Sequence, residues 1–378
     1  MTPLPASYRP PGAETRTDWS GRDDGPEPDL RRWHQAVALH DLRAELDHCL
    51  EPTLCFIGYA SDAGIRANLG RPGAAEGPRR LRQRMAPFPA IAGVTLIDCG
   101  DVIDGADVRA TQDALAAAVE RIARAGALPV VLGGGHDQAF GHFLGLARAI
   151  GSAPACVNLD AHLDLRPLSA AGPNSGTPFT QAWEWCRAQG APFRYAALGV
   201  QRLGNTGRLF ARAEEAGATI VDADGFALDM IDVLMDAVND AVDEAEICLS
   251  IDLDVFAEAF APGVSAPTAM GIAPDAAFRR VLRGFIASER VRGLEIAELS
   301  PPHDVDERTA RLGASIVFEV ANELAAVARG EREEAEDDES LDGDSLDGDS
   351  FDGDSFDGDS LDDDSLDGGT PGAEDASR

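Results

Sequence analysis

The chain has 378 residues, 44% of them hydrophobic, enough to bury the core of one large domain or two ordinary ones. Its formal net charge is −34, which argues against nucleic acid or an anionic membrane as a partner. All 32 basic residues are arginine, so the composition suggests a halophilic protein, although a codon bias would also explain the absence of lysine.

The two ends of the chain differ from its middle. Residues 1–30 are rich in Pro and Gly and predict an extended N-terminal arm. Residues 331–378 carry 21 acidic and two basic side chains and repeat a five-residue unit of the type LDGDS. We expect a disordered acidic tail, because one apolar residue in five cannot form a core. A calcium site in this tail is less favoured, since the closing Glu of an EF-hand loop is absent.

The predicted location of the protein is the cytoplasm. The N-terminus lacks the apolar segment of a signal peptide, and no stretch approaches the 18 apolar residues of a membrane span. The six cysteines show no metal-binding spacing and lie mostly in apolar runs, as buried thiols do in a reducing compartment.

Between residues 31 and 330, apolar runs alternate with helix-like stretches. The expected strands are 53–60, 93–101, 128–135, 155–162, 193–200, 218–224, 246–256 and 292–300. The expected helices are 108–125, 137–150, 205–216, 228–242, 274–287 and 306–328. Buried strands that alternate with helices form a parallel sheet covered on both faces. We therefore expect one α/β domain with three layers, α/β/α, around a parallel sheet of about eight strands.

Ionisable residues follow four of the expected strands, and ligands of open parallel sheets bind at that edge. The groups are His136, then Asp160, His162 and Asp164, then Asp252 and Asp254, and finally Glu298. Spacing by two on an extended segment directs the members of a group to one side. Each motif alone could be a surface turn or a helix cap, but their joint occurrence favours a shared site.

The residue types at this edge indicate a metal site. Four carboxylates in one place repel one another unless cations neutralise them, and two divalent ions match their charge. Imidazole with carboxylate oxygen favours manganese or a similar ion, while the lack of thiolate argues against structural zinc. A water between two ions about 3.5–4 Å apart is acidified into a nucleophile at neutral pH.

The remaining histidines do not share this pattern. Four of them fall in helix-like segments and are interpreted as packing or surface residues: His34, His40, His48 and His142. His303 follows Glu298 closely, and whether it faces the site is left open.

Taken together, GGGHD, NLDAHLDLR, SIDLDVF and EIAELSPPHD resemble motifs of the ureohydrolase family, which includes arginase, agmatinase and formimidoylglutamase. The resemblance covers roughly residues 50–328 and implies an arginase/deacetylase fold with two Mn²⁺ ions per subunit. It implies that His136 and Asp164 hold one ion, His162 and Asp254 the other, and that Asp160 and Asp252 bridge both. It further implies that Glu298 orients the nitrogen end of the substrate and that Asp254 carries a proton to the leaving amine.

Segments 18–24, 32–35, 58–82, 174–179 and 260–271 are similar to formimidoylglutamases rather than arginases. Arginases carry a catalytic histidine after the DxHxD motif, and we expect Phe179 at the corresponding position. Arg71, Arg79 and Arg202 are candidates to bind the substrate carboxylates, because Arg offers a bidentate fork. Each could equally be an ion-paired surface residue.

The sequence therefore predicts hydrolysis of N-formimidoyl-L-glutamate to L-glutamate and formamide, a step of histidine degradation. The family resemblance also implies a homo-oligomer, with dimer, trimer and hexamer all open. One alternative is another ureohydrolase, such as agmatinase, guanidinobutyrase or arginase, which would release urea; a decarboxylated substrate would not need Arg71 or Arg79. The other is a non-catalytic metal-binding homologue whose acidic tail recruits a partner, although the presence of all six ligands and Glu298 argues against it.

Overall fold

A computed structural model describes residues 2–25 and 27–331. Residues Met1–Arg332 group into one compact unit. The predicted disordered tail lies outside the described residues, apart from Glu331 at its start. Within the described residues, none of the helices combines the length and the apolar character needed to cross a membrane.

The eight expected strands are confirmed, each within a few residues of its predicted bounds. They are β3 (Thr53–Ala60), β4 (Thr95–Ile103), β5 (Leu128–Leu132), β6 (Ala155–Leu159), β7 (Tyr195–Val200), β8 (Thr219–Asp222), β9 (Ile247–Asp252) and β10 (Val291–Ala297). Two further strands of two residues each, β1 (Tyr8–Arg9) and β2 (Ala38–Leu39), were not expected, because two residues show no periodicity. The described residues thus form one sheet in the order β1-β4-β3-β5-β10-β9-β6-β7-β8, with β2 beside β4. Only β1 runs antiparallel to its neighbour.

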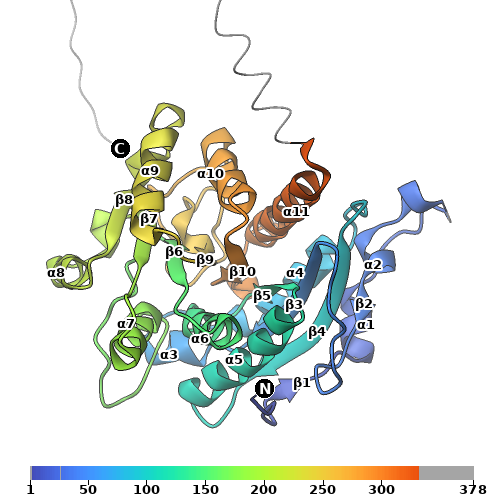
Figure 1. Ribbon diagram of the computed structural model, residues 1–378, viewed down its shortest axis with the longest axis horizontal. Helices are drawn as coiled ribbons and strands as arrows, with labels where there is room; N and C mark the ends of the chain where they lie inside the picture. The colour runs from blue at the N-terminus through green and yellow to red at the C-terminus, as the bar shows by residue number, and fades with distance from the viewer. Residues whose placement is uncertain (1, 26, 332–378) are drawn as a thin grey trace, which may run out of the picture. The chain divides into compact units, whose positions relative to one another are not determined.

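Helices cover both faces of this sheet, as Figure 1 shows. One face packs against α4 (Gly77–Met85), α9 (Ile231–Val242), α10 (Ala276–Ala287) and α11 (Arg308–Arg329). The other packs against α5 (Val108–Arg124), α6 (Gln138–Ile150), α7 (Pro178–Gln189) and α8 (Gly207–Glu215). Strand β3 shows why: Leu54 and Phe56 join the first core, whereas Cys55 and Ile57 join the second. Side chains of a strand alternate between faces, so an unbroken apolar run fills both cores and confirms the three-layer prediction.

Helix ends follow local sequence signals. The side chain of Asp107 accepts a hydrogen bond from the Ala110 amide at the start of α5, and Asp275 accepts from Ala277 and Phe278 at the start of α10. Helices α6 and α7 end at Gly151 and Gly190, whose left-handed backbone suits glycine. The six expected helices are confirmed, while α4 and α7 lie in stretches where the sequence did not predict helix.

The first 30 residues are not the extended arm that their composition predicts. They contain β1 and the short helix α1 (Ala13–Asp18), and two of their aromatic side chains are buried. The Tyr8 hydroxyl donates to the Cys99 carbonyl at 2.9 Å and accepts from the Leu42 amide at 2.9 Å. Trp19 Nε1 donates to Asp98 Oδ2 at 2.6 Å. Burial of these rings fixes the segment against the sheet despite its Pro and Gly content. Two small helices, α2 (Trp33–Ala36) and α3 (Ala63–Ala67), complete the N-terminal half.

Candidate metal centre and substrate pocket

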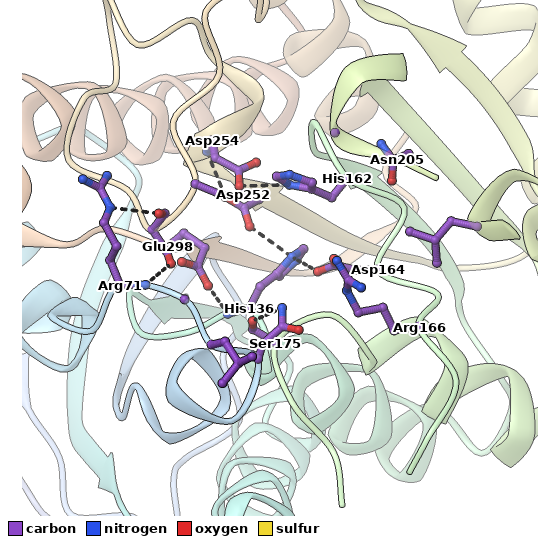
Figure 2. Close-up of a pocket in the computed structure, with 17 residues that line it drawn as sticks. Arg71, His136, His162, Asp164, Arg166, Ser175, Asn205, Asp252, Asp254 and Glu298 are labelled. Atoms are coloured by element: carbon purple, nitrogen blue, oxygen red, sulfur yellow. Dashed lines mark hydrogen bonds and ion pairs between the residues drawn. The ribbon is translucent and has the colours of Figure 1, made fainter. Parts of the chain in front are cut away.

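The four strand ends that carry ionisable residues are neighbours in the sheet. Strands β5, β10, β9 and β6 lie side by side in that order and run parallel. Their carboxyl ends therefore meet at one edge, and the residues that follow them converge there (Figure 2). We call six of these residues the floor: His136, Asp160, His162, Asp164, Asp252 and Asp254.

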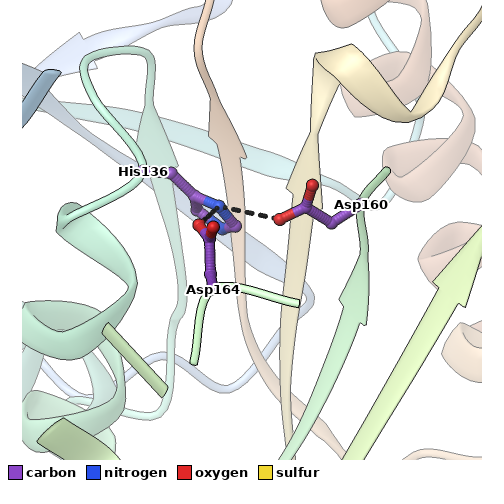
Figure 3. A group of neighbouring side chains, drawn as sticks. All are labelled: His136, Asp160 and Asp164. Atoms are coloured by element: carbon purple, nitrogen blue, oxygen red, sulfur yellow. Dashed lines mark ion pairs between the residues drawn. The ribbon is translucent and has the colours of Figure 1, made fainter. Parts of the chain in front are cut away.

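The imidazole of His136 stands at the centre of the floor. Its Nδ1 lies 3.1 Å from Asp160 Oδ2, 2.9 Å from Asp164 Oδ2 and 3.1 Å from Asp252 Oδ2. Figure 3 shows the Asp160 and Asp164 carboxylates aimed at this nitrogen. A single N–H cannot satisfy three carboxylates, and Nδ1 has no geometrically acceptable hydrogen-bond partner among the described residues. Three oxygens gathered around one ring nitrogen instead form a group that fits a cation.

A second group forms around His162. Its Nδ1 lies 3.4 Å from Asp160 Oδ1 and 3.1 Å from Asp254 Oδ2. The two oxygens of Asp160 therefore face different histidines, which is the geometry of a bridging carboxylate. Ligand atoms of His136, Asp160 and Asp164 lie within 4.8 Å of one another, and so do those of Asp160, His162 and Asp254. The structure brings all six floor residues together, in two groups that share Asp160.

Backbone amides fix two of these carboxylates. Asp160 Oδ1 accepts from the His162 amide at 2.7 Å, and Asp252 Oδ1 accepts from the Asp254 amide at 2.8 Å. Both bonds join residues two positions apart, so the DxH and DxD motifs orient their first carboxylate locally. Asp254 Oδ1, in contrast, is buried and has no hydrogen-bond partner among the described residues.

The electrostatics of the floor require positive charge. Burial raises the pKa of Asp164 to about 6 and also raises the pKa values of Asp252 and Asp254. Burial acts in the same direction on Asp160, but the nearby imidazoles of His136 and His162 outweigh it and lower the pKa of that carboxyl. The pKa of His162 lies well above its usual value because of the Asp254 charge, and that of His136 is raised by its carboxylate neighbours against the effect of burial. The carboxylates thus attract protons to the site unless other cations take their place.

Glu298 lies beside the floor and lines the same pocket. Its Oε1 accepts from the His136 amide at 2.9 Å, while its buried Oε2 has no partner among the described residues. Burial raises the pKa of this carboxyl well above its usual value. Glu298 and Asp164 both have a left-handed backbone, with φ of 66° and 46°, a conformation that costs free energy in residues other than glycine.

A pocket of about 340 Å³ opens above the floor. Besides the floor and Glu298, six polar residues line this pocket, and we call them the rim: Asn68, Arg71, Arg166, Ser175, Asn205 and Ser265. Figure 2 shows Arg71 on the Glu298 side of the pocket and Arg166 on the Asp164 side. The rim therefore places a positive side chain on each side of an acidic floor.

Of the three arginines expected to bind substrate, only Arg71 lines the pocket. Its Nε donates to the Ser265 carbonyl at 3.0 Å and its Nη2 to the Val264 carbonyl at 2.6 Å. Arg79 is a wrong prediction: it lies on the outer surface of α4, where its Nε pairs with Asp18 Oδ1 at 3.2 Å. The guanidinium of Arg202 lies over the ring of Phe210, 5.9 Å from its centroid, and Arg202 does not line the pocket.

Arg166 is the pocket-lining cation that the sequence analysis did not single out. Its amide donates to the Gly176 carbonyl at 2.9 Å, and its guanidinium has no hydrogen bond or ion pair with the described residues. A signal for it exists in the sequence. The alternation that selects Asp160, His162 and Asp164 continues, two positions further, to Arg166.

The expectation for Phe179 also needs correction. Phe179 is 3% exposed, and its ring packs against His136 and Tyr195, with centroids 5.8 Å and 4.5 Å away. It occupies the first turn of α7, which turns its apolar side toward the core, so it does not reach the pocket. Ser175, four residues earlier, lines the pocket instead.

The other histidines lie away from the pocket lining. His303 Nδ1 lies 2.9 Å from Ser300 Oγ, and His303 is not among the residues that line the pocket. The question left open by the sequence is therefore answered: His303 does not face the pocket. His142 is fully buried on α6 and lies 3.3 Å from the Cys248 thiol, as expected of a packing residue.

Comparisons with known proteins agree with this geometry. The model of the arginase family matches residues 53–322. A formimidoylglutamase of Ralstonia nicotianae is 39% identical over 318 residues, which cover 82% of this chain and 96% of that protein. A formimidoylglutamase of Chromobacterium violaceum is 40% identical over 315 residues, covering 81% of this chain and 97% of that protein.

Solved structures show the same fold. A Trypanosoma cruzi formiminoglutamase determined with Mn²⁺ superposes with a TM-score of 0.66 at 24% identity, covering 72% of this chain and 94% of that one. The formimidoylglutamase of Bacillus subtilis gives a TM-score of 0.64 at 22% identity, covering 76% of this chain and 92% of that one.

Proposed function

The chain belongs to the arginase family, and from this premise we propose that it hydrolyses N-formimidoyl-L-glutamate to L-glutamate and formamide. Its curated relatives with that name align over nearly their whole length. The proposal would place the protein in histidine degradation, in agreement with the sequence analysis.

The observation that carries the proposal is the pairing of an acidic floor with an arginine rim. N-formimidoyl-L-glutamate has a cationic amidine at one end and two carboxylates on its glutamyl part, one beside the amidine nitrogen and one at the far end. Glu298 and the floor suit the amidine, while Arg166 and Arg71 suit the carboxylates. A decarboxylated guanidine substrate would offer these arginines no carboxylate to bind.

The floor also fits two divalent cations, and we propose Mn²⁺. The fit rests on the unpartnered buried atoms His136 Nδ1 and Asp254 Oδ1 and on a donor set of imidazole and carboxylate. One ion would be held by His136 and Asp164, the other by His162 and Asp254, with Asp160 and Asp252 shared. When bound, such a pair neutralises the carboxylates and lowers the pKa of a water molecule to about 7.

The chain's own residues would then guide the hydrolysis. Glu298 is fixed through Oε1 by the His136 amide, which leaves Oε2 to accept an N–H of the formimidoyl group. As water adds to the formimidoyl carbon and the C–N bond to glutamate breaks, the leaving nitrogen needs a proton. We assign that proton transfer to Asp254, whose Oδ1 is without a partner.

The rim would select the glutamyl group. Arg166 is free to form a bidentate pair with one carboxylate. Arg71 is oriented by the carbonyls of Val264 and Ser265, and its remaining N–H groups are available to the other. Ser175 lines the same wall, and its hydroxyl accepts from Asn68 Nδ2 at 3.1 Å, which leaves its own hydrogen for the substrate.

A second candidate is a ureohydrolase that acts on a guanidino acid with one carboxylate and releases urea. The observation that favours it is the engagement of Arg71 with two backbone carbonyls, which makes Arg166 the one pocket arginine free of partners in the described residues. Such a substrate would need one arginine rather than two.

Product analysis tests both candidates. The manganese-loaded protein is incubated with N-formimidoyl-L-glutamate, arginine, 4-guanidinobutyrate or agmatine, at low and at molar salt. Formamide and glutamate from the first substrate alone are the expected result. Urea from arginine or 4-guanidinobutyrate would replace the proposal by the second candidate, and urea from agmatine would contradict both candidates. No product from any of the four would indicate a non-catalytic homologue. Light scattering on the same sample tests the expected homo-oligomer.

A further inference from the structure

Three buried polar residues lie behind His136, away from the pocket. Ser250 is on β9, Glu295 is on β10, and His142 is on α6. Ser250 and Glu295 pair across the two strands, and none of the three is more than 1% exposed. They do not line the pocket, so the proposed reaction does not use them directly.

Ser250 and Glu295 lie near the ring nitrogen of His136 that points away from the floor. Ser250 Oγ lies 2.8 Å from His136 Nε2, and Glu295 Oε1 lies 3.9 Å from the same nitrogen. His162 has no equivalent support: its side chain is 25% exposed, and its Nε2 has no hydrogen bond with the described residues. The two floor histidines thus differ: Nε2 of His136 has polar neighbours, whereas Nε2 of His162 has no hydrogen bond among the described residues.

Glu295 lies beside two imidazoles and forms no ion pair with an arginine of the described residues. Neither of its carboxylate oxygens has a geometrically acceptable hydrogen bond among the described residues. The nearest histidine on its other side, His142, lies 3.6 Å away, but burial lowers the pKa of His142 to about 3, so that imidazole is neutral. An unpaired buried carboxylate destabilises a fold unless positive charge nearby offsets it. Cations bound at the floor would supply that positive charge.

We infer that Ser250 and Glu295 are positioning residues for His136, holding its Nε2–H from behind so that Nδ1 faces Asp160, Asp164 and Asp252. Hydroxyl and carboxylate groups behind a ligating histidine fix its tautomer and strengthen its free nitrogen as a donor. The inference rests on the proposed metal centre. Because His162 lacks such support, the effect should be confined to the ion on the His136 side.

The test compares Mn²⁺ binding by Ser250→Ala, Glu295→Leu and Glu295→Gln with that of the unaltered chain. Equilibrium dialysis gives the affinity of each ion, and electron paramagnetic resonance distinguishes a coupled ion pair from a single ion. We expect Ser250→Ala and Glu295→Leu to bind one ion normally and the other about 10- to 100-fold more weakly, with a single-ion spectrum at intermediate Mn²⁺ concentration. Glu295→Gln should lose less, because it keeps the volume and an acceptor oxygen.

Glu120→Gln provides a matched control. Glu120 is a buried carboxyl on α5, 3% exposed, that contacts Thr2 and Arg124 and no floor residue. Its variant should bind both ions as the unaltered chain does. Melting temperatures of the metal-free variants report on folding, and if Glu295→Leu does not fold, the two milder variants decide the outcome.

Unchanged binding of both ions by folded Ser250→Ala and Glu295→Gln would overturn the inference. Equal weakening of both ions would also overturn it, since that would indicate general damage rather than support of His136. Failure of the unaltered chain to bind Mn²⁺ would remove the metal centre and the inference together. If the unaltered chain binds two ions but forms no formamide, the proposed reaction fails, and the variant comparison still decides the role of Ser250 and Glu295.

Discussion

The floor and the rim of the pocket are built in different ways. Floor residues follow three parallel strands, β5, β9 and β6, with β10 between β5 and β9, and the sheet register fixes their positions. Rim residues come from loops that are far apart in the chain, such as those carrying Arg71, Arg166 and Ser265. The floor belongs to the rigid part of the fold, whereas the rim depends on how separate loops meet. Metal binding and substrate selection should therefore be separable by mutation.

The largest expected effect is on the floor. Asp252→Ala removes a carboxylate 3.1 Å from His136 Nδ1 and the acceptor of the Asp254 amide. We expect the bound Mn²⁺ to fall below two ions per chain and kcat/KM to fall on the order of 1,000-fold. Metal analysis of the purified variant, together with formamide release, checks both. Full activity in a variant without bound metal would rule out the proposed metal centre.

Glu298→Gln should separate catalysis from metal binding. Glutamine still accepts the His136 amide hydrogen bond, but it removes the negative charge that faces the amidine. We expect kcat to fall about 100-fold while the metal content stays unchanged. Steady-state kinetics and metal analysis on one preparation test this. An unchanged kcat would show that Glu298 has no role in orienting the substrate.

On the rim, Arg166→Ala should weaken substrate binding and leave the metal in place. Loss of a charge-assisted pair with one carboxylate is expected to cost about 10- to 100-fold in kcat/KM, mainly through KM. Arg79→Ala is the matched control, because Arg79 pairs with Asp18 outside the pocket, and its kcat/KM should match that of the unaltered chain. A larger loss in Arg79→Ala than in Arg166→Ala would contradict our assignment of the rim.

The last prediction concerns His142, in the core behind the floor. The expected effect is on the free energy of unfolding and not on the rate of the reaction. Burial lowers the pKa of His142 to about 3, whereas an unfolded chain has a His pKa of about 6.5. Between these values His142 binds more protons in the unfolded chain, so its contribution to the free energy of unfolding falls as the pH falls, by about 1.4 kcal/mol per pH unit. His142→Leu should remove this dependence.

Urea unfolding of the metal-free protein between pH 6.5 and pH 4 measures the slope. The exposed His48 serves as the control, and His48→Gln should keep the slope of the unaltered chain. An identical slope in His142→Leu would mean that His142 does not contribute to acid destabilisation.

The contrast between a floor built on strand ends and a rim built on loops also explains which parts of the site the sequence could predict. The floor could be identified because alternation by two on strand ends is a local pattern, and the topology of a parallel sheet brings such ends together. The rim could be predicted only in part: Arg71 was a candidate and the alternation by two reaches Arg166, but contacts between loops leave no period that identifies the other rim residues. Arg79 and Arg71 lie in the same glycine-rich stretch, yet α4 turns one to the surface while the loop before it brings the other to the pocket.

The errors at the N-terminus and in the loop before α7 have a similar origin. Pro and Gly content alone suggested an extended arm, but two buried aromatic rings decide the path of residues 1–30. Phe179, in the first turn of α7, was expected to correspond to the catalytic histidine of arginases, because a short motif does not show which of its residues faces the pocket. Packing against Tyr195 turns Phe179 toward the core and leaves Ser175 at the pocket.

The left-handed backbone of Asp164 has a consequence for engineering this protein. Two features of Asp164 cost free energy at neutral pH. Its φ of 46° is unfavourable for a residue other than glycine, and burial, which raises the pKa of its carboxyl to about 6, disfavours its negative charge. Asp164→Gly should therefore raise the melting temperature of the metal-free chain while removing a proposed ligand. A screen that ranks variants by thermal stability would favour this change, so selection for robustness alone would tend to erase the site.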